Sequence, residues 1–446
     1  MRTLVGRPRV LRLIALVLAA AIWLPCVPTI YRGRSAGFVS TGALSTGAGA
    51  LMVHQRALWD DPVMRRREVE PMRRSNPEWD FMGRSFDVWA LANAAMRDES
   101  TPLPPSLKGR GKEDEERGSR RAEYLLMMDR IIDDTLAMQR SRGMRYFLMG
   151  YAREGKFVQQ PERSQFEDGE IALMLGMRRM VEEKPEYGAL QRSLVHAIVD
   201  RMTSSPTLSC ESYPNECWTF CNACALAAIA TSDRLDGTDH SDLFRRWVEF
   251  ARTHLTDART GLLISAYTIE GKPIYGPEGS SIWFVCHMLD VVDPAFARDQ
   301  YERAKRVLKG SVGRFDYARE NPRGLHGSNA IDSGVVVPGI DVSAGSTGMA
   351  FLAASTFGDR EFLDGLASTM DFGGFPIQDG HGLRYAAGNQ VSDAVFLYAS
   401  TMGPVWERIS QDSGHLDAGP RPPNSQSLGN RTDSPLSTRP IAGGSR

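Results

Sequence analysis

The chain has 446 residues, of which 42% are hydrophobic and 24% are charged, so it can bury a large core. Its 53 lysine and arginine residues balance its 54 aspartate and glutamate residues, which argues against nucleic acid or an acidic polymer as a partner. Six cysteines are too few for a disulfide-stabilised scaffold of this length.

The first thirty or so residues have the pattern of an export signal. Four arginines precede the apolar run "LIALVLAAAIWLPCVPTIY", which carries no charge before Arg32. A basic segment followed by such a run is typical of a signal peptide or signal anchor, and roughly 20 apolar residues suffice to span a bilayer. We therefore predict a transmembrane or signal helix within residues 1–32, and the pattern favours an uncleaved anchor that places the folded domain on the exported side.

Three later segments lack the apolar pattern of a folded element. Residues 33–74 begin with a stretch rich in Gly, Ser and Thr and are predicted to be a linker. Residues 101–121 combine proline, glycine and many charges, which predicts a mobile loop. Residues 409–446 contain almost no large apolar side chains and are predicted to be a disordered tail. One domain, residues 75–408, remains.

Within this domain, helical patterns alternate with breaks at Gly, Pro and Asp. The predicted helices cover residues 85–97, 120–140, 167–183, 188–203, 218–234, 241–255, 279–291, 295–309, 346–357, 360–369 and 391–409. No series of strands alternates with them, as a parallel sheet would require. Antiparallel helix pairs of this kind close into a solenoid or an (α/α) toroid, and the lack of a strict repeat favours the toroid. We therefore predict an all-α domain with a cavity at the ends of its inner helices.

Four cysteines crowd into the segment "SCESYPNECWTFCNAC", residues 209–224. Their spacing, C-x6-C-x3-C-x2-C, lacks the two C-x2-C pairs that are typical of a zinc site. Cys217, Cys221 and Cys224 recur on one face of a predicted helix, where a disulfide between the first two is disfavoured. We expect Cys217 and Cys224 to be buried apolar side chains.

Cys210 and Cys221 differ in their neighbours. Cys210 precedes Glu211 in an irregular segment, and Cys221 precedes Asn222 near the start of a predicted helix. A helix dipole lowers the pKa of a thiol at that position and favours the reactive thiolate. The two cysteines are therefore candidates for chemistry.

The segment that begins "CESYPNECWTFCNAC" resembles the linalool dehydratase/isomerase family. The resemblance includes the pairs Cys-Glu at 210 and Cys-Asn at 221 and the motif "DPAF" at 293, in the family's order and at nearly its spacings. The upstream segments "WDFMGRSFDVWAL" and "GEIALMLG" and the downstream "GLRY" at 382 also resemble family segments. The likeness extends over about residues 75–405.

The resemblance implies an (α/α)6 barrel with its active site at the barrel mouth. It also implies export to the periplasm and no metal or organic cofactor. Two cysteines and an aspartate of the family act on an allylic alcohol, and the matching positions are Cys210, Cys221 and Asp80. Where the family has a histidine, this chain has Glu170. The expected catalytic residues are therefore Asp80, Glu170, Cys210 and Cys221, and the expected substrate-binding residues are Phe166, Glu211, Asn222 and Trp283.

The chain departs from the family at three points. Glu170 replaces an imidazole by a carboxyl group, which needs burial or a neighbouring like charge to act as an acid near neutral pH. The family's substrate-facing tyrosine after the aspartate has no counterpart, and "GRSFDVW" lacks the cysteines of its stabilising disulfide. The identity of the substrate therefore stays open.

The expected function is that of a hydro-lyase or isomerase that acts on a small, apolar, terpenoid-like alcohol or alkene by acid–base chemistry. A glycoside hydrolase that uses paired carboxylates is the second hypothesis. A noncatalytic isoprenoid- or lipid-binding protein is the third. The expected partners are a small apolar substrate and the inner membrane, with the barrel on its periplasmic side, or alternatively the chain is secreted to the periplasm. The sequence leaves the choice between monomer and homo-oligomer open.

Overall fold

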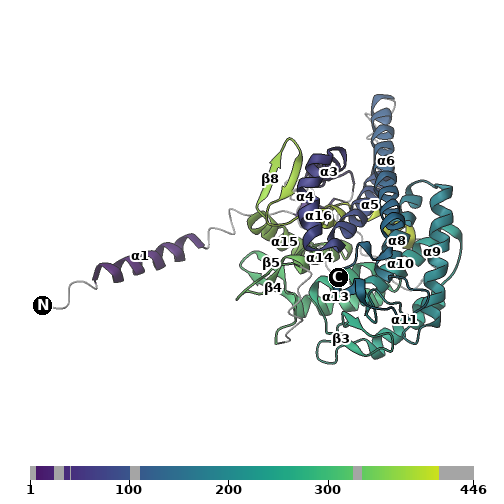
Figure 1. Cartoon of the computed structure of the whole chain (residues 1–446). Helices are drawn as coiled ribbons and strands as arrows, with labels where there is room; N and C mark the ends of the chain where they lie inside the picture. Colours follow the sequence, from purple (N-terminus) through teal and green to yellow (C-terminus); the bar gives the residue numbers. More distant parts are fainter. Residues whose placement is uncertain (1–6, 25–34, 41, 101–110, 325–333, 411–446) are drawn as a thin grey trace, which may run out of the picture. The chain divides into compact units, whose positions relative to one another are not determined.

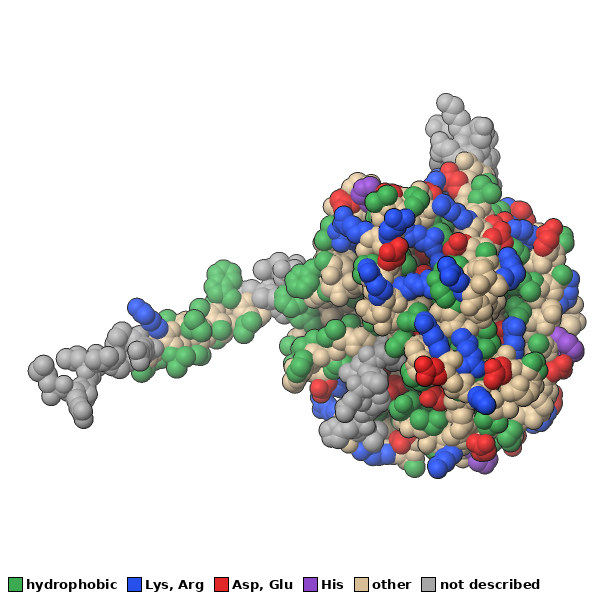
Figure 2. Space-filling view, viewed as in Figure 1, with side chains coloured by type: hydrophobic (Ala, Val, Ile, Leu, Met, Phe, Trp, Pro, Cys, Tyr) green, Lys and Arg blue, Asp and Glu red, His purple; other side chains and the backbone are tan. Residues whose placement is uncertain are grey.

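The computed structural model describes residues 7–24, 35–40, 42–100, 111–324 and 334–410. This part of the chain is mainly helical (Figure 1). Figure 2 shows basic and acidic side chains interspersed over the visible face of the domain, as the balanced composition leads one to expect.

Six helices form a closed ring, because each contacts the next along the chain and the sixth contacts the first. They are α5 (Pro77–Ser100), α8 (Gln165–Val181), α10 (Thr219–Asp236), α12 (Gly279–Leu289), α14 (Ala344–Thr356) and α16 (Gln390–Thr401). Ring helices are apolar on most sides because neighbours surround them, and every residue of α8 is buried. The helical, barrel-like fold predicted from the sequence is thus confirmed.

Further helices pack outside the ring. α6 contacts α5, α9 contacts α8, α13 contacts α12, and α15 contacts α14. The outer helices are amphipathic, and α11 buries only one face. The bounds are α6 Gly111–Arg142, α7 Gly150–Glu154, α9 Pro185–Ser204, α11 Ser241–His254, α13 Pro294–Leu308, α15 Arg360–Gly373 and α17 Pro404–Ser410. Two 3₁₀ turns cover Ser35–Gly37 and Met144–Tyr146.

Short antiparallel strands, which an all-α domain would lack, join several of the helices. One sheet has the order β1-β2-β3, and β4-β5, β6-β7 and β8-β9 are two-stranded. The strands are β1 Cys217–Trp218, β2 Ala266–Tyr267, β3 Pro273–Tyr275, β4 Lys309–Val312, β5 Phe315–Ala318, β6 Val336–Val337, β7 Val342–Ser343, β8 Pro376–Asp379 and β9 Gly382–Tyr385. Cys217 therefore lies in a strand and not in the helix predicted for it, because its backbone pairs with Tyr267.

The predicted linker over residues 33–74 is largely helical instead. α3 (Thr46–Asp60) and α4 (Pro62–Ser75) occupy most of it, and Ser45 and Asp61 cap their first turns. α3 buries its apolar side chains against β9 and α16, which the glycine-rich start of the segment does not reveal.

The other predicted boundaries shift by smaller amounts. The predicted loop over 101–121 ends early, because α6 begins at Gly111, and residues 101–110 lie outside the described residues. The last predicted helix is broken at Gly403, which has a φ of 135° and precedes the proline that starts α17. Of the predicted disordered tail, residues 411–446 lie outside the described residues.

The predicted membrane helix corresponds to α1 (Arg7–Trp23), which has 17 residues. Its apolar side chains are exposed, among them Leu13, Leu16 and Ile22. Within the described residues, no helix combines the length and apolar character needed to cross a bilayer, so the structure does not support the predicted transmembrane helix.

Candidate active site at the mouth of the helix ring

A cavity of about 350 Å³ lies at one end of the ring, a volume typical of small-molecule sites. All six ring helices line it with residues from their first two turns or from just before them. These residues include Glu78 of α5, Phe166 of α8, Cys221 of α10, Ser281 of α12, Gly345 of α14 and Val391 of α16. The ring helices therefore all begin at the same end, and the cavity lies at their amino termini.

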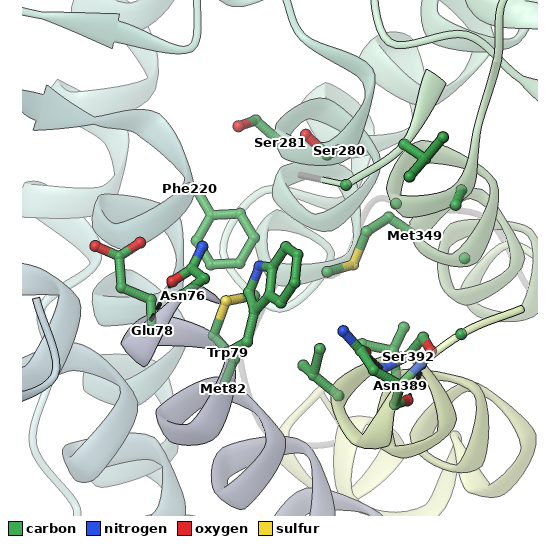
Figure 3. A pocket seen from close by; sticks show the side chains of 18 of the residues that line it. Asn76, Glu78, Trp79, Met82, Phe220, Ser280, Ser281, Met349, Asn389 and Ser392 are labelled. Carbon is green, nitrogen blue, oxygen red and sulfur yellow. Dashed lines mark hydrogen bonds between the residues drawn. The ribbon is translucent and has the colours of Figure 1, made fainter. Parts of the chain in front are cut away.

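The cavity wall is mainly aromatic and apolar (Figure 3). Large side chains on it are Trp79, Met82, Phe166, Trp218, Phe220 and Met349. Among the described lining residues, Glu78 is the one charged side chain, and no lysine, arginine or histidine lines the cavity. Such a wall suits a neutral, mostly apolar molecule, because phosphate and carboxylate groups are normally held by cationic side chains.

Aromatic side chains fill the ring below the cavity. Phe220 stacks on Phe284 at a centroid distance of 3.8 Å. Deeper in the ring, His287 is hydrogen-bonded through both ring nitrogens, to Thr356 Oγ1 and to Tyr398 Oη, each at 2.8 Å. Burial lowers the pKa of His287 to about 3, so this imidazole is neutral at physiological pH. We conclude that His287 belongs to the core and not to the cavity.

Glu78 presents a carboxyl group at the edge of the cavity. Its side chain is largely buried, and its Oε1 accepts the backbone N–H of Met149 at 3.1 Å. Its own backbone N–H donates to Asn76 Oδ1 at 2.9 Å, which fixes the start of α5. Both the helix start and the carboxyl group are therefore held in place. This residue was not among the candidates drawn from the sequence.

Glu170 lies behind the cavity wall, one turn into α8, and does not line the cavity. It is fully buried, and neither carboxyl oxygen accepts a hydrogen bond among the described residues. Burial raises its pKa to about 8, the nearby Ser85 hydroxyl opposes this rise, and the charge of Glu78 adds to it. Glu170 is therefore mostly a neutral carboxylic acid at pH 7.

Cys221 lines the cavity next to these two carboxyl groups. Burial raises the pKa of its thiol well above the ordinary value, the Ser212 hydroxyl opposes this rise, and the charges of Glu170 and Glu78 add to it. The predicted helix-dipole activation of this cysteine is thus wrong, because desolvation at the mouth outweighs the dipole. Cys221 is a neutral thiol that is electrostatically coupled to both glutamates.

Asp80 does not line this cavity, although the family resemblance implies a catalytic role. Its Oδ2 accepts from Arg73 Nη1 at 2.8 Å and its Oδ1 from Arg84 Nε at 2.9 Å. Residues two apart on a helix point in nearly opposite directions, and the two arginines hold the Asp80 carboxylate on the side of α5 away from Glu78. The placement makes Asp80 the centre of a buried ion-pair network and not a proton donor to a ligand in this cavity.

Cys210 and Asn222 also lie outside the cavity lining. Asn222 Oδ1 accepts the backbone N–H of Cys210 at 2.8 Å, and its Nδ2 donates to the Cys210 carbonyl oxygen at 3.0 Å. Burial raises the pKa of the Cys210 thiol to about 12, against the opposing charge of Arg201. The pair joins the loop before β1 to α10, so the prediction that Cys210 faces the mouth is wrong for this cavity.

Glu211 organises a loop and does not face the ligand space. Its carboxylate accepts backbone N–H groups from Val158 at 3.0 Å, Gln159 at 2.6 Å and Asn215 at 2.5 Å. Its substrate-binding assignment is therefore wrong for this cavity, because three backbone donors already occupy the carboxylate.

Trp283 likewise belongs to the core. It is fully buried, packs on Tyr301 and Phe362, and donates from Nε1 to Ser346 Oγ at 3.1 Å. Of the eight site residues predicted from the sequence, Cys221 and Phe166 are the two that line the cavity. The start of each inner helix is the signal that could have identified Glu78, Trp79 and Ser281.

We expect the free energy of unfolding to fall as pH rises from about 5 to 8. Burial raises the pKa of Glu170 and of Glu167 to about 8 and that of Asp87 to about 7. The folded state thus holds these protons more tightly than the unfolded chain, and their contribution is lost as pH rises through the folded-state values. Glu170→Gln removes one of these groups, so the free energy of unfolding should fall by a few kcal/mol less between pH 5 and 8. This magnitude follows from about 1.4 kcal/mol for each unit by which the pKa is raised. Urea unfolding at pH 5, 7 and 9 measures the free energy of unfolding of the wild type and of Glu170→Gln. The same dependence on pH in the two proteins would contradict the expectation.

The family model of linalool dehydratase/isomerase matches residues 163–391. The chain belongs to this family. The match covers α8, α10, α12 and α14 with their cavity residues, whereas α5 with Glu78 precedes it. Among solved structures, a selenomethionine derivative of a GH76 α-mannanase from Bacteroides thetaiotaomicron is similar over 74% of this chain and 87% of that chain, at 12% identity and a TM-score of 0.41. That likeness is too weak to assign a substrate to this chain.

Proposed function

We propose that this protein is a cofactor-independent hydro-lyase and isomerase, built on an (α/α)6 barrel, that acts on a small, neutral, mostly apolar alcohol or alkene. The observation that supports this most is the cavity itself. Its wall is aromatic, Glu78 is its one charged group among the described residues, and Cys221 lies beside it with Glu170 behind. Family membership supports the class of reaction.

The proposed reaction needs only a proton donor and a proton acceptor. A protonated glutamate gives its proton to the hydroxyl oxygen, and the carbon–oxygen bond breaks with both electrons leaving on water. The resulting allylic cation loses a proton from a neighbouring carbon to a carboxylate, and the C–H electrons form the new double bond. Return of water to the other end of the allyl system, with release of a proton, gives the isomeric alcohol.

We assign the contact with the substrate to Glu78, because it lines the cavity. Glu170 is the proton reservoir in this scheme, since its carboxyl group is mostly protonated at pH 7 and is coupled to both Glu78 and Cys221. The Cys221 thiol contacts the reacting carbons as an uncharged group. In this scheme Asp80 and Cys210 stabilise the fold and do not contact the substrate.

The aromatic wall supports the same reaction. Phe166, Trp218 and Phe220 line the cavity, and an aromatic ring whose face meets a cation stabilises it by about 0.5 to 2 kcal/mol. A neutral alcohol becomes cationic only as its carbon–oxygen bond breaks, so this attraction favours the transition state over the bound substrate.

The test is turnover by the purified full chain of linalool, geraniol and myrcene, which are a tertiary alcohol, its primary isomer and the derived alkene. We expect interconversion of at least one pair, detected by gas chromatography. Binding of these compounds without turnover would replace the proposal with a noncatalytic isoprenoid-binding protein. Hydrolysis of oligosaccharides that depends on Glu78 would replace it with a glycosidase.

We also propose, from the amino-terminal sequence pattern, that the chain is exported to the inner membrane or the periplasm. Cell fractionation tests this. Recovery of the full-length chain from the cytoplasm alone would contradict it.

A further inference from the structure

Several polar side chains line the cavity, and two of them, Glu78 and Ser281, come from opposite sides of the helix ring. The contact order around the ring is α5, α8, α10, α12, α14 and α16, so α12 stands across from α5. Glu78 lies in the first turn of α5 and Ser281 in the first turn of α12, and both line the cavity (Figure 3). Apolar side chains, including Trp79 and Phe220, make up much of the wall of the same cavity.

The Ser281 hydroxyl has no hydrogen-bond partner among the described residues, and the residue is 5% exposed. The neighbouring Ser280 differs, because its hydroxyl donates to Glu320 Oε1 at 2.5 Å. The Ser281 oxygen is not among the fully buried side-chain atoms that lack a partner, so it is open to the cavity, where a ligand group can bond to it. One such hydrogen bond contributes roughly 0.5 to 1.5 kcal/mol.

The group that Ser281 would bind must be neutral. The Glu320 carboxylate already occupies the first turn of α12, where it accepts the Ser280 backbone N–H at 3.2 Å and the Ser343 hydroxyl at 2.7 Å. An anionic ligand group would meet this carboxylate, and no lysine, arginine or histidine among the described lining residues would offset the repulsion. A hydroxyl or carbonyl group fits both the position and the charge.

We propose that the substrate carries two neutral polar groups at opposite ends of an apolar carbon skeleton. The reacting alcohol lies at Glu78, and a second hydroxyl or carbonyl group is hydrogen-bonded by Ser281. This inference rests on the proposed function for the reacting end. The substrate class is then an oxygenated, terpenoid-sized alcohol and not a simple hydrocarbon alcohol.

The test compares two substrates that differ only in the second group: linalool and its 8-hydroxy derivative. We expect the wild-type protein to have the higher kcat/KM for the 8-hydroxy compound. Ser281→Ala should lower kcat/KM for this compound about tenfold more than for linalool, the effect of one lost hydrogen bond. Ser281→Thr, which keeps the hydroxyl, should retain the preference. Thermal unfolding of each variant checks that the fold is intact.

A binding measurement separates this inference from the proposed function. Quenching of tryptophan fluorescence by the 8-hydroxy compound reports binding in a Glu78→Gln background, where turnover is removed, with and without Ser281→Ala. If neither compound is turned over but Ser281→Ala weakens binding of the 8-hydroxy compound selectively, the proposed reaction fails and the second contact stands. If linalool is turned over and Ser281→Ala affects both compounds equally, the second contact is overturned alone.

Discussion

Glu78→Gln should lower kcat on an allylic alcohol by 100-fold or more, the effect typical of removing a general acid or base. The amide has nearly the same size and can still accept the Met149 backbone N–H, so the loss should appear in kcat and not in stability. Initial rates at saturating substrate, together with the midpoint of thermal unfolding, measure both quantities. A variant that retains more than about a third of the wild-type kcat would remove Glu78 from the mechanism.

Asp80→Asn is the matched control, two residues along the same helix. It removes one of the two carboxylates that pair with the buried Arg84, the other being Asp134, and breaking a buried ion pair costs up to about 3 to 5 kcal/mol. We therefore expect a large loss of stability and a kcat within a few-fold of wild type for the folded fraction. The opposite pattern, with activity lost and stability kept, would return the catalytic role to Asp80.

Gly348→Leu should abolish turnover by filling the cavity while the protein stays folded. Gly348 lines the cavity from the second turn of α14, and a Cβ atom there would meet no other atom within 4 Å. Replacing a helical glycine stabilises a helix by up to about 1 kcal/mol, so the unfolding midpoint should not fall. The added side chain would occupy space that the substrate needs.

Gly118→Leu is the control for this change. Gly118 is an exposed glycine of α6, is absent from the cavity wall, and likewise has open space around its Cβ position. We expect it to keep wild-type kcat/KM. Equal activity of the two leucine variants would show that the substrate does not occupy the cavity at the ring mouth.

The helices could be predicted from the sequence, and the direction of individual side chains could not. The ring helices α8, α10 and α12 begin and end within a few residues of the predicted segments, because their apolar residues and terminal breaks are local signals. The role of Asp80 depends on Arg73, which lies in α4 within the predicted linker. Without that helix, the sequence pattern does not reveal that Asp80 pairs with Arg73 while Glu78 lines the cavity.

The electrostatic predictions failed where burial decided the outcome. The thiol of Cys221 stands near a helix start, as predicted, but desolvation at the mouth raises its pKa. Glu211 binds the backbone of Val158 and Gln159, more than fifty residues earlier in the chain. Such contacts join residues that are far apart in the chain and form only when the helix ring closes. Patterns in a single sequence indicate local structure, so they do not predict these contacts.

The most direct measurement is the fate of oxygen when the full chain is incubated with linalool in water enriched in oxygen-18. If water leaves and returns at Glu78, the recovered linalool and the geraniol that forms must contain the heavy isotope, and Glu78→Gln must prevent its incorporation. Recovery of unlabelled linalool with neither geraniol nor myrcene would contradict the account.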